Sequence, residues 1–514
     1  MPLTAIPYPG FGAGLDLQSQ VDVVSPEAAI DCLNVTFTQK GAVESRAGYG
    51  LFTAVAGTNK YDSMIPYYTT SGTRQLVVGA GNRLEGLSSA GAVVASVATT
   101  ANPHFFTRFG GPTAEVVYAA NGTDALRQWN AAAWSTPAWT GTSPTGKFVE
   151  VTPYDNRLVC ARYGTGTAGV NQSSVRFSDN VTTGAPLNWG ANNYVDLTPG
   201  DGEPIMGMIA WRNYLFVFKQ SKFFRFSSTT TDSTGNPVFN YDTVDTGIGM
   251  CSSLALCAGR DGVYFMDDTG IYRTTGGPPV DVSDKIAPFF TGGTSAFFLT
   301  PPLNRGALSQ PAMTWHNQQV FVSVPTGTSS TNDRVFVFDT TYGWWTVYDL
   351  PAQALASFEI SAGISELVFA LSTGTKDIGR HSSSYSTDNG TAITSRWNSG
   401  WYDFKDTTVK SVREMKAWGQ GTAIVGINKD FTVAAGGAVC AFASALPTWG
   451  GSTWGGTTWS SGESLNVKQV RGIAKRGTVF SLTVASSAGS SWSLNRLTTH
   501  IRSKRTPSIT RTEA

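Results

Sequence analysis

The sequence predicts an all-β protein with a β-propeller of about seven blades, a C-terminal antiparallel β-sandwich and an extended N-terminal arm. Three observations lead to this prediction: the composition, a strand pattern that recurs between residues 76 and 371, and a change of pattern near Trp397. Aromatic residues make up 12% of the 514 residues and charged residues only 14%, and there are 56 glycines. Such a composition is typical of strands joined by many turns and is too apolar for a disordered chain.

A short apolar run, a polar turn and a second run rich in apolar and aromatic residues recur together seven times. Successive copies begin 41 to 57 residues apart. A strand-based period of about 40–50 residues is typical of propeller blades, because one thin blade needs neighbours to cover both of its apolar faces. A large sandwich with an accidental rhythm is the alternative, which seven copies disfavour. The copies begin at Leu76, Val117, Leu158, Leu215, Val263, Val320 and Leu367.

The pattern divides the chain into three parts. Residues 1–50 do not repeat and have too little apolar surface to fold alone, so we expect an arm that crosses between domains or subunits. Within this arm, the residues that follow Ser25 suit a helix start, so a single helical turn is expected before a strand at 35–37. Residues 51–390 are assigned to the propeller. Residues 391–514 are assigned to the sandwich, because polar and apolar residues alternate there as in strands with one wet face.

The C-terminal part contains two further features. We expect a long strand at 409–418 and another at 423–427, separated by a Gly-Gln-Gly turn. A loop at 449–459 carries three tryptophans at five-residue spacing with glycines between them, which suits neither a helix face nor a strand face. Exposed tryptophans suggest a docking surface or a sugar platform, unless they fold back on the sandwich. The residues that we expect to dock a partner are Trp449, Trp454, Trp459, Lys475, Arg476, Arg502, Lys504 and Arg505.

The net charge of +1 conceals an asymmetry along the chain. Residues 466–514 contain nine basic residues and one acidic residue, so residues 1–465 carry a net charge of about −7. The chain is therefore expected to have a mildly acidic body and a basic C-terminal segment.

We find no motif that predicts catalysis, a cofactor or a metal site. The sequence lacks a Gly-x-Ser-x-Gly elbow, a phosphate-binding Gly-Lys-Ser/Thr loop, a His-Glu-x-x-His pair and a Cys-x-x-Cys pair. The five cysteines are scattered and the four histidines are far apart, so we expect no metal ion and no cofactor. No apolar run is long enough to span a membrane, and the first residues do not resemble a secretory signal. We therefore expect a protein that is not an enzyme.

Three stretches of the chain match the pattern of a known family. Near the N-terminus the matching positions are Pro26, Ala29, 31–35, Gly41 and 45–48, with Ala47 where proline is common. In the middle they are 155–158, 175–179, Trp189, 201–205 and 215–219. Near the end they are 471–472, 475–477 and 496–497. In these stretches the chain resembles the tail-nozzle proteins of short-tailed bacteriophages, also called tail tubular or DNA-stabilisation proteins, and related phage minor tail proteins.

The resemblance implies a structural virion protein without catalysis. It would form the tail nozzle, a ring at the end of the DNA channel that retains DNA and conducts it during ejection. The implied partners are further copies of the chain in a homohexamer, the head-to-tail adaptor proteins, and tail fibres or spikes. Phage DNA would pass non-specifically, with no membrane insertion. The implied location is the phage tail of the virion, after synthesis in the host cytoplasm.

The distribution of charge along the chain is compatible with a channel that conducts DNA. Each contact with a phosphate adds salt-dependent affinity, so a channel that must release DNA is better lined by acidic residues. The acidic excess in residues 1–465 would supply such a lining, and the basic segment 466–514 would then meet an acidic partner subunit. Two alternatives stay open: a receptor- or carbohydrate-binding tail component that uses the tryptophan loop, and a propeller glycosidase, which would need two carboxylates at a fixed separation.

Overall fold

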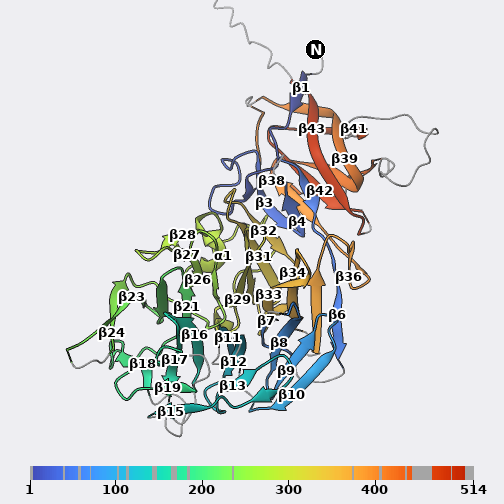
Figure 1. Cartoon of the computed structure of the whole chain (residues 1–514). Helices are drawn as coiled ribbons and strands as arrows, with labels where there is room; N and C mark the ends of the chain where they lie inside the picture. Colours follow the sequence, from blue (N-terminus) through green and yellow to red (C-terminus); the bar gives the residue numbers. More distant parts are fainter. Residues whose placement is uncertain are drawn as a thin grey trace, which may run out of the picture.

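The computed structural model describes residues 4–503, except for 39–40, 56–59, 70, 101–102, 111–114, 142–147, 164–170, 182–185, 234–236, 373–375, 405–407, 434–436, 443–465 and 488. Strands dominate the described residues, and the helices among them are short: η1 (Asp284–Ile286), α1 (Ala287–Thr291) and η2 (Arg305–Ala307). The molecule consists of a propeller and, beyond one of its edges, a second sheet structure that contains both N-terminal and C-terminal strands (Figure 1).

Six four-stranded antiparallel sheets and one six-stranded sheet form the seven blades of the propeller, which confirms the predicted fold class and blade number. The seven sequence copies form the second and third strands of successive blades, because each apolar run lies between two neighbouring strands and two neighbouring blades. The innermost strands contact one another in a closed ring, in which the first blade meets the seventh.

In the first six blades, the strands follow sequence order from the propeller axis outward. The first two blades contain β7 (Ser63–Tyr68), β8 (Arg74–Ala80), β9 (Arg83–Ser88), β10 (Val93–Ala98), and β11 (Phe105–Gly110), β12 (Glu115–Ala120), β13 (Arg127–Trp129), β14 (Trp134–Ser135). The third and fourth contain β16 (Glu150–Tyr154), β17 (Arg157–Tyr163), β18 (Asn171–Phe177), β20 (Tyr194–Asp196), and β21 (Gly207–Trp211), β22 (Tyr214–Phe218), β23 (Lys222–Thr231), β24 (Pro237–Asp245). The short strands β15 (Trp139–Gly141) and β19 (Leu187–Trp189) pair with each other in parallel.

The remaining blades have the same order. The fifth and sixth contain β25 (Leu256–Ala258), β26 (Val263–Met266), β27 (Ile271–Thr274), β28 (Val280–Asp281), and β29 (Ala312–His316), β30 (Gln319–Val324), β31 (Arg334–Asp339), β32 (Trp345–Tyr348). The seventh contains β33 (Ala352–Ser361), β34 (Ile364–Leu371), β35 (Lys376–His381) and β6 (Tyr49–Val55), with β36 (Thr387–Asp388) and β37 (Thr391–Ala392) at its edge.

The seventh blade takes its outer strand from the beginning of the chain. β6 pairs antiparallel with β35, with Tyr49 opposite His381 and Val55 opposite Lys376. Two segments more than 300 residues apart in sequence therefore close the ring, and the hydrogen bonds of one blade hold the first and last blades together.

The strands after the propeller form an antiparallel sandwich, as predicted, together with strands of residues 1–50. The C-terminal strands are β38 (Arg396–Ser399), β39 (Lys410–Lys429), β40 (Ala438–Ala441), β41 (Asn466–Gly477), β42 (Phe480–Ser486) and β43 (Trp492–Ser503). The N-terminal strands are β1 (Thr4–Pro7), β2 (Gly14–Leu15), β3 (Ala28–Leu33), β4 (Val35–Phe37) and β5 (Val43–Ser45). β39 belongs to both layers: its first half pairs with β41 and β43, and its second half pairs with β40 and β42.

Two local expectations are wrong. The Ser25 hydroxyl accepts a hydrogen bond from the Glu27 amide at 3.4 Å, as a helix start would, but the chain then continues as the buried strand β3, which pairs with β38. Tertiary pairing overrides the local preference here. Residues 419–421, which we expected to form a turn, are part of β39, and the strand continues through them.

The sandwich and the propeller share a packed core. β32, the outer strand of the sixth blade, contacts β2, β3 and β4. The Asn34 amide donates to the carbonyl of Val347 at 2.7 Å, and the Thr346 hydroxyl donates to the carbonyl of Val35 at 2.7 Å. Buried apolar residues of both parts belong to one cluster, so the junction is a continuous hydrophobic core.

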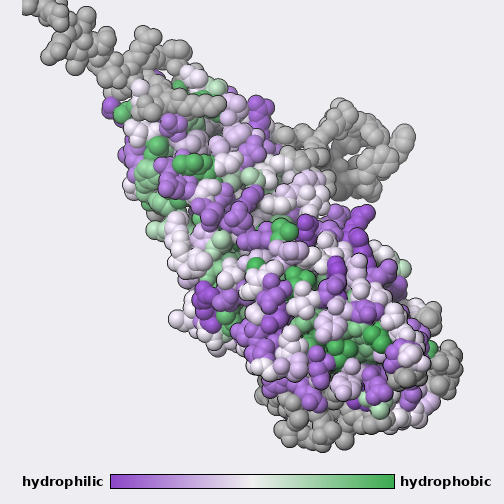
Figure 2. Space-filling model, turned by 90° about the vertical axis from the view of Figure 1, so that its left-hand side faces the viewer, coloured by the Kyte–Doolittle hydropathy of each residue, from purple (hydrophilic) through white to green (hydrophobic). Residues whose placement is uncertain are grey.

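The outline of the molecule is elongated, with the sandwich at one end and the propeller at the other (Figure 2). Hydrophilic and neutral residues cover most of the face in this view, with smaller hydrophobic areas on both the sandwich and the propeller. Within the described ranges, no helix is long and apolar enough to cross a membrane.

Candidate functional site

Three of the expected docking residues lie at the outer end of the sandwich. Arg476 on β41 and Arg502 on β43 are both register partners of Ser411, which lies between them on β39. Directly paired residues point to the same face of a sheet, so the two exposed arginines share one face. Lys475 is half-buried opposite Val412. The other expected docking residues, which are Trp449, Trp454, Trp459, Lys504 and Arg505, fall outside the described residues.

The spacing of these arginines suits an anionic partner. Neighbouring strands lie about 4.8 Å apart, so the Cα atoms of Arg476 and Arg502 are separated by about 10 Å. Further along β43, the Arg496 guanidinium lies 5.1 Å from the centre of the Trp418 ring. The Glu414 carboxylate on β39 accepts a hydrogen bond from Gln469. The face is therefore basic at its outer end and mixed in charge further in.

A buried ion pair joins two segments of the middle stretch of the family resemblance, 201–205 and 215–219. The Lys219 side chain has no solvent exposure, and its Nζ lies 2.9 Å from both carboxylate oxygens of Asp201. The Lys219 hydrogen bonds hold the pKa of Asp201 well below its usual range, although burial opposes them. Lys219 Nζ also donates to the hydroxyl of Ser173 on β18 at 3.0 Å. These contacts hold the third and fourth blades together. Within the third blade, the Ser178 hydroxyl accepts from the Leu158 amide at 2.9 Å.

The N-terminal stretch of the resemblance lies at the junction of sandwich and propeller. Arg396 and the fully buried carboxylate of Asp31 form an ion pair at 2.6 Å. The Asn34 side-chain oxygen accepts from the Asp349 amide at 2.7 Å and from the Arg46 guanidinium at 2.8 Å. Polar residues of this stretch therefore fix the position of the sandwich on the sixth blade.

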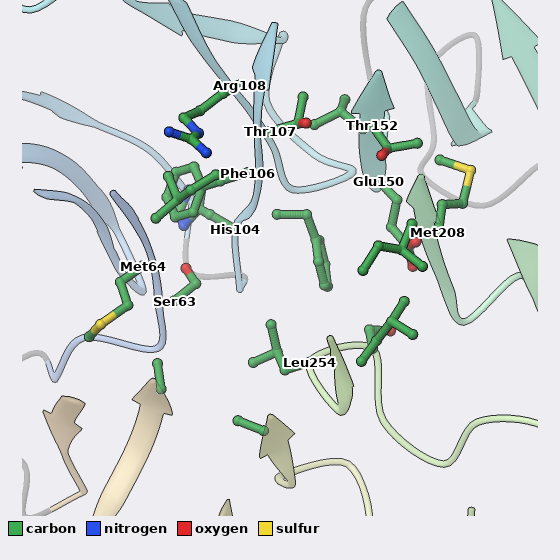
Figure 3. Close-up of a pocket in the computed structure, with 18 of the residues that line it drawn as sticks. Ser63, Met64, His104, Phe106, Thr107, Arg108, Glu150, Thr152, Met208 and Leu254 are labelled. Carbon is green, nitrogen blue, oxygen red and sulfur yellow. The ribbon is translucent and has the colours of Figure 1, made fainter. Parts of the chain in front are cut away.

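A cavity of about 500 Å³ lies on the propeller axis, where the inner strands of the blades face one another (Figure 3). Most of the side chains that line it are apolar, including Met64, Phe105, Met208, Leu254 and Met313, but polar atoms contribute somewhat more of its surface than apolar atoms. Pockets of this size bind small molecules in other proteins. No sequence motif marks this cavity, because the inner strands precede the seven copies and vary in length and composition.

Two buried titratable side chains line the cavity. Glu150, at the start of β16, is 4% exposed, and its Oε1 has no hydrogen-bond partner among the described residues. Burial raises the pKa of Glu150 to about 8, although the charge of Arg162 lowers it. His104 is 1% exposed, and burial lowers its pKa to about 4. In Figure 3, Glu150 lies beside Met208, on the wall opposite Ser63 and His104.

Glu150 could have been suspected from the sequence. It is the acidic residue at the start of a short run that ends in the Asp155-Asn156 turn, and a polar residue at such a position faces either solvent or the channel. Strand alternation alone does not distinguish these two environments.

A scan against protein-family models finds no matching family, and a search of curated proteins finds no match. Among solved structures, a structure of streptogramin B lyase is 11% identical, with a TM-score of 0.41, and the match covers 65% of this chain and 97% of that chain. A structure of BBS1N in complex with ARL6DN is 12% identical, with a TM-score of 0.39, and the match covers 66% of this chain and 98% of that chain. Both TM-scores are below 0.5, so the propeller assignment rests on the strand pairing described above.

Proposed function

We propose that this chain is a structural protein of a short-tailed bacteriophage virion, which forms the tail nozzle as a homohexameric ring at the end of the DNA channel. In this role it retains DNA before ejection and conducts it afterwards, without catalysis. It meets the head-to-tail adaptor proteins, and tail fibres or spikes attach to it. The chain is made in the host cytoplasm and functions in the phage tail.

The observation that carries this proposal is the convergence of the first and last stretches of the family resemblance. Residues 45–48 and 496–497 are more than 400 positions apart, yet the strands that carry or adjoin them belong to one sheet. Val43 on β5 is the register partner of Leu494 on β43, and the Trp492 amide donates to the Ser45 hydroxyl at 3.1 Å. The first and last stretches of the resemblance thus lie together in the sandwich.

The middle stretch adds support in the same way. Its members 201–205 and 215–219 are joined by the pair of Asp201 with the buried Lys219. A buried lysine needs such a partner, because an unpaired charge in the interior is costly. The matched residues are therefore tied to one another by specific contacts, as expected for positions that define a common architecture.

Immunogold negative-stain imaging of the virions tests the proposal. An antibody raised against the recombinant chain is expected to label the tail tip, where a ring of several 54.6 kDa chains is visible. Light scattering of the recombinant chain adds its mass in solution, but the virion image decides, because assembly can require the adaptor. Labelling of the capsid or fibres instead, or of no part of the particle, would contradict the nozzle assignment.

A further inference from the structure

The cavity on the propeller axis combines many apolar side chains with one buried carboxyl group. Inner-strand residues of the blades surround about 500 Å³, and Met208, Leu254 and Met313 contribute apolar surface. Arg108, near the end of β11, lines the same cavity and is exposed, so solvent reaches this end. A ligand that enters would transfer an apolar body out of water, which is favourable at about 25 cal/mol per Å² of buried apolar area.

Glu150 lacks a charged partner within the described structure. None of the ion pairs found among the described residues includes it, and its Oε1 accepts no hydrogen bond from them. The nearest cation that influences it is Arg162, whose Nη1 instead donates to the carbonyl of Ile205 at 3.3 Å. The carboxylate accepts a hydrogen bond from the Met208 backbone, but Oε1 has no partner among the described residues. Burial of an unpartnered carboxyl oxygen is costly, so such a group is retained where a ligand completes its interactions.

The chemistry of the wall indicates which ligand would complete them. A carboxylate oxygen accepts hydrogen bonds and pairs with cations, and most of the side chains that line the cavity around it are apolar. An anionic ligand would be repelled by Glu150. A purely apolar ligand would leave Oε1 unpartnered.

We propose that the axial cavity of the propeller is a binding site for a small organic ammonium ion with an apolar body, whose positive charge pairs with the Glu150 carboxylate. Oε1 is buried in the empty site, so the Glu150 side chain turns toward the cavity when the ammonium group donates to it, and the apolar body lies against Met208 and Leu254. This site is independent of the proposed nozzle function, since it needs neither a ring nor a virion.

The proposed pairing has a characteristic pH dependence. Burial raises the pKa of Glu150 to about 8, so the empty site holds a neutral carboxylic acid below this pH. Binding of an ammonium ion then releases one proton. The affinity is expected to rise about tenfold per pH unit up to pH 8 and to level off above it, until the amine itself loses its proton.

Isothermal titration calorimetry of the full chain with benzylamine tests the site, and benzyl alcohol serves as the neutral probe of similar shape. We expect saturable benzylamine binding at pH 8.5, with weaker binding at pH 6. Two buffers of different ionisation enthalpy are expected to report release of one proton at pH 7. Cyclohexylamine and 1,4-diaminobutane extend the probe set to other shapes.

Two variants assign the binding to Glu150. Glu150→Gln keeps the size of the side chain but removes its charge, so benzylamine affinity is expected to fall at least about tenfold and to lose its pH dependence. Glu115→Gln makes the same chemical change at an exposed position outside the cavity and is expected to bind as the wild type does. Equal affinity of the wild type and Glu150→Gln, or no saturable binding of any of the three amines, would overturn the proposal.

Discussion

Arg46 and Asp388 form an ion pair that joins the N-terminal strands to β36, at the edge of the seventh blade. The Arg46 side chain has no solvent exposure, and its Nη2 lies 2.5 Å from the Asp388 Oδ2. Arg46 Nη1 donates to the other carboxylate oxygen at 2.9 Å, so the contact is bidentate. Because Arg46 also donates to Asn34, one guanidinium connects the sandwich, the sixth blade and the closing blade.

Replacement of Asp388 is expected to destabilise the whole molecule. Asp388→Ala leaves a buried guanidinium without its counter-ion, which costs about 3–5 kcal/mol of unfolding free energy. Thermal unfolding followed by circular dichroism measures the loss. Asp268→Ala is the matched control, because its pair with Arg305 is 2.7 Å long but about half exposed, and such pairs contribute about 0–1 kcal/mol. Equal losses in the two variants would refute a special role for the buried pair.

Gly14 is expected to be intolerant of a side chain. Its φ is +73°, and a Cβ atom there would lie 2.5 Å from the Cβ of Trp344. Gly41 has the same φ of +73° but open space around it. Gly41→Ala therefore measures the backbone strain alone, about 1–2 kcal/mol, and Gly14→Ala adds an overpacking cost of about 1–3 kcal/mol. Urea unfolding of both variants measures the difference in unfolding free energy. Equal losses of unfolding free energy would mean that the chain around Trp344 shifts to accommodate the Cβ atom at no cost in stability.

The buried carboxyl group makes stability depend on pH. The pKa of Glu150 is raised to about 8 in the folded state, so the folded protein keeps this proton at a pH at which the unfolded chain has lost it. The contribution of Glu150 to stability is therefore fully present below about pH 4.5 and is lost as the pH rises to 8.

Glu150→Gln removes this dependence. Relative to the wild type, the variant is expected to gain stability between pH 5 and pH 9, by up to about 5 kcal/mol of unfolding free energy. Melting temperatures of the variant and the wild type across this range, without any added ligand, measure this difference in stability. For Glu115→Gln, the difference from the wild type should not change with pH, because the Glu115 side chain is exposed. A gap for Glu150→Gln that does not change with pH would mean that the carboxyl group is solvated in the folded state.

The propeller could be predicted because its second and third strands are buried on both faces. Runs such as the one that begins at Leu215 are continuously apolar, and their recurrence gives the number of blades. The closing strand β6 could not be predicted, because Tyr49–Val55 carries no copy of the pattern and its partner β35 lies more than 300 residues away. Closure is a property of long-range pairing, which a local pattern does not contain.

The glycines of β39 illustrate the same limit within one strand. Gly419 and Gly421 resemble a turn in sequence, yet Cβ atoms at these positions would lie 2.1 Å from the carbonyl oxygens of Ser493 and Ser491. The glycines therefore permit close approach of β43, at a shift of register where β39 passes from one layer of the sandwich to the other. Both a turn and a close approach require glycine, and only the partner strand distinguishes them.

The exposed pair of Arg476 and Arg502 provides a test of the docking surface. The double variant Arg476→Glu, Arg502→Glu is expected to keep the melting temperature of the wild type, because both side chains are exposed. It is expected to lose contact with an acidic partner, because like charges that face each other at an interface cost several kcal/mol. Complementation of a phage that lacks the gene measures this contact as plaque formation and as the amount of the chain in purified virions.

The double variant Arg212→Glu, Arg260→Glu changes two exposed arginines of the propeller and controls for the change in net charge. We expect plaques with the control and few or none with the sandwich variant, because the basic face of β41 and β43 and not the total charge recruits the partner. Equal plaque numbers would place the partner contact elsewhere on the molecule.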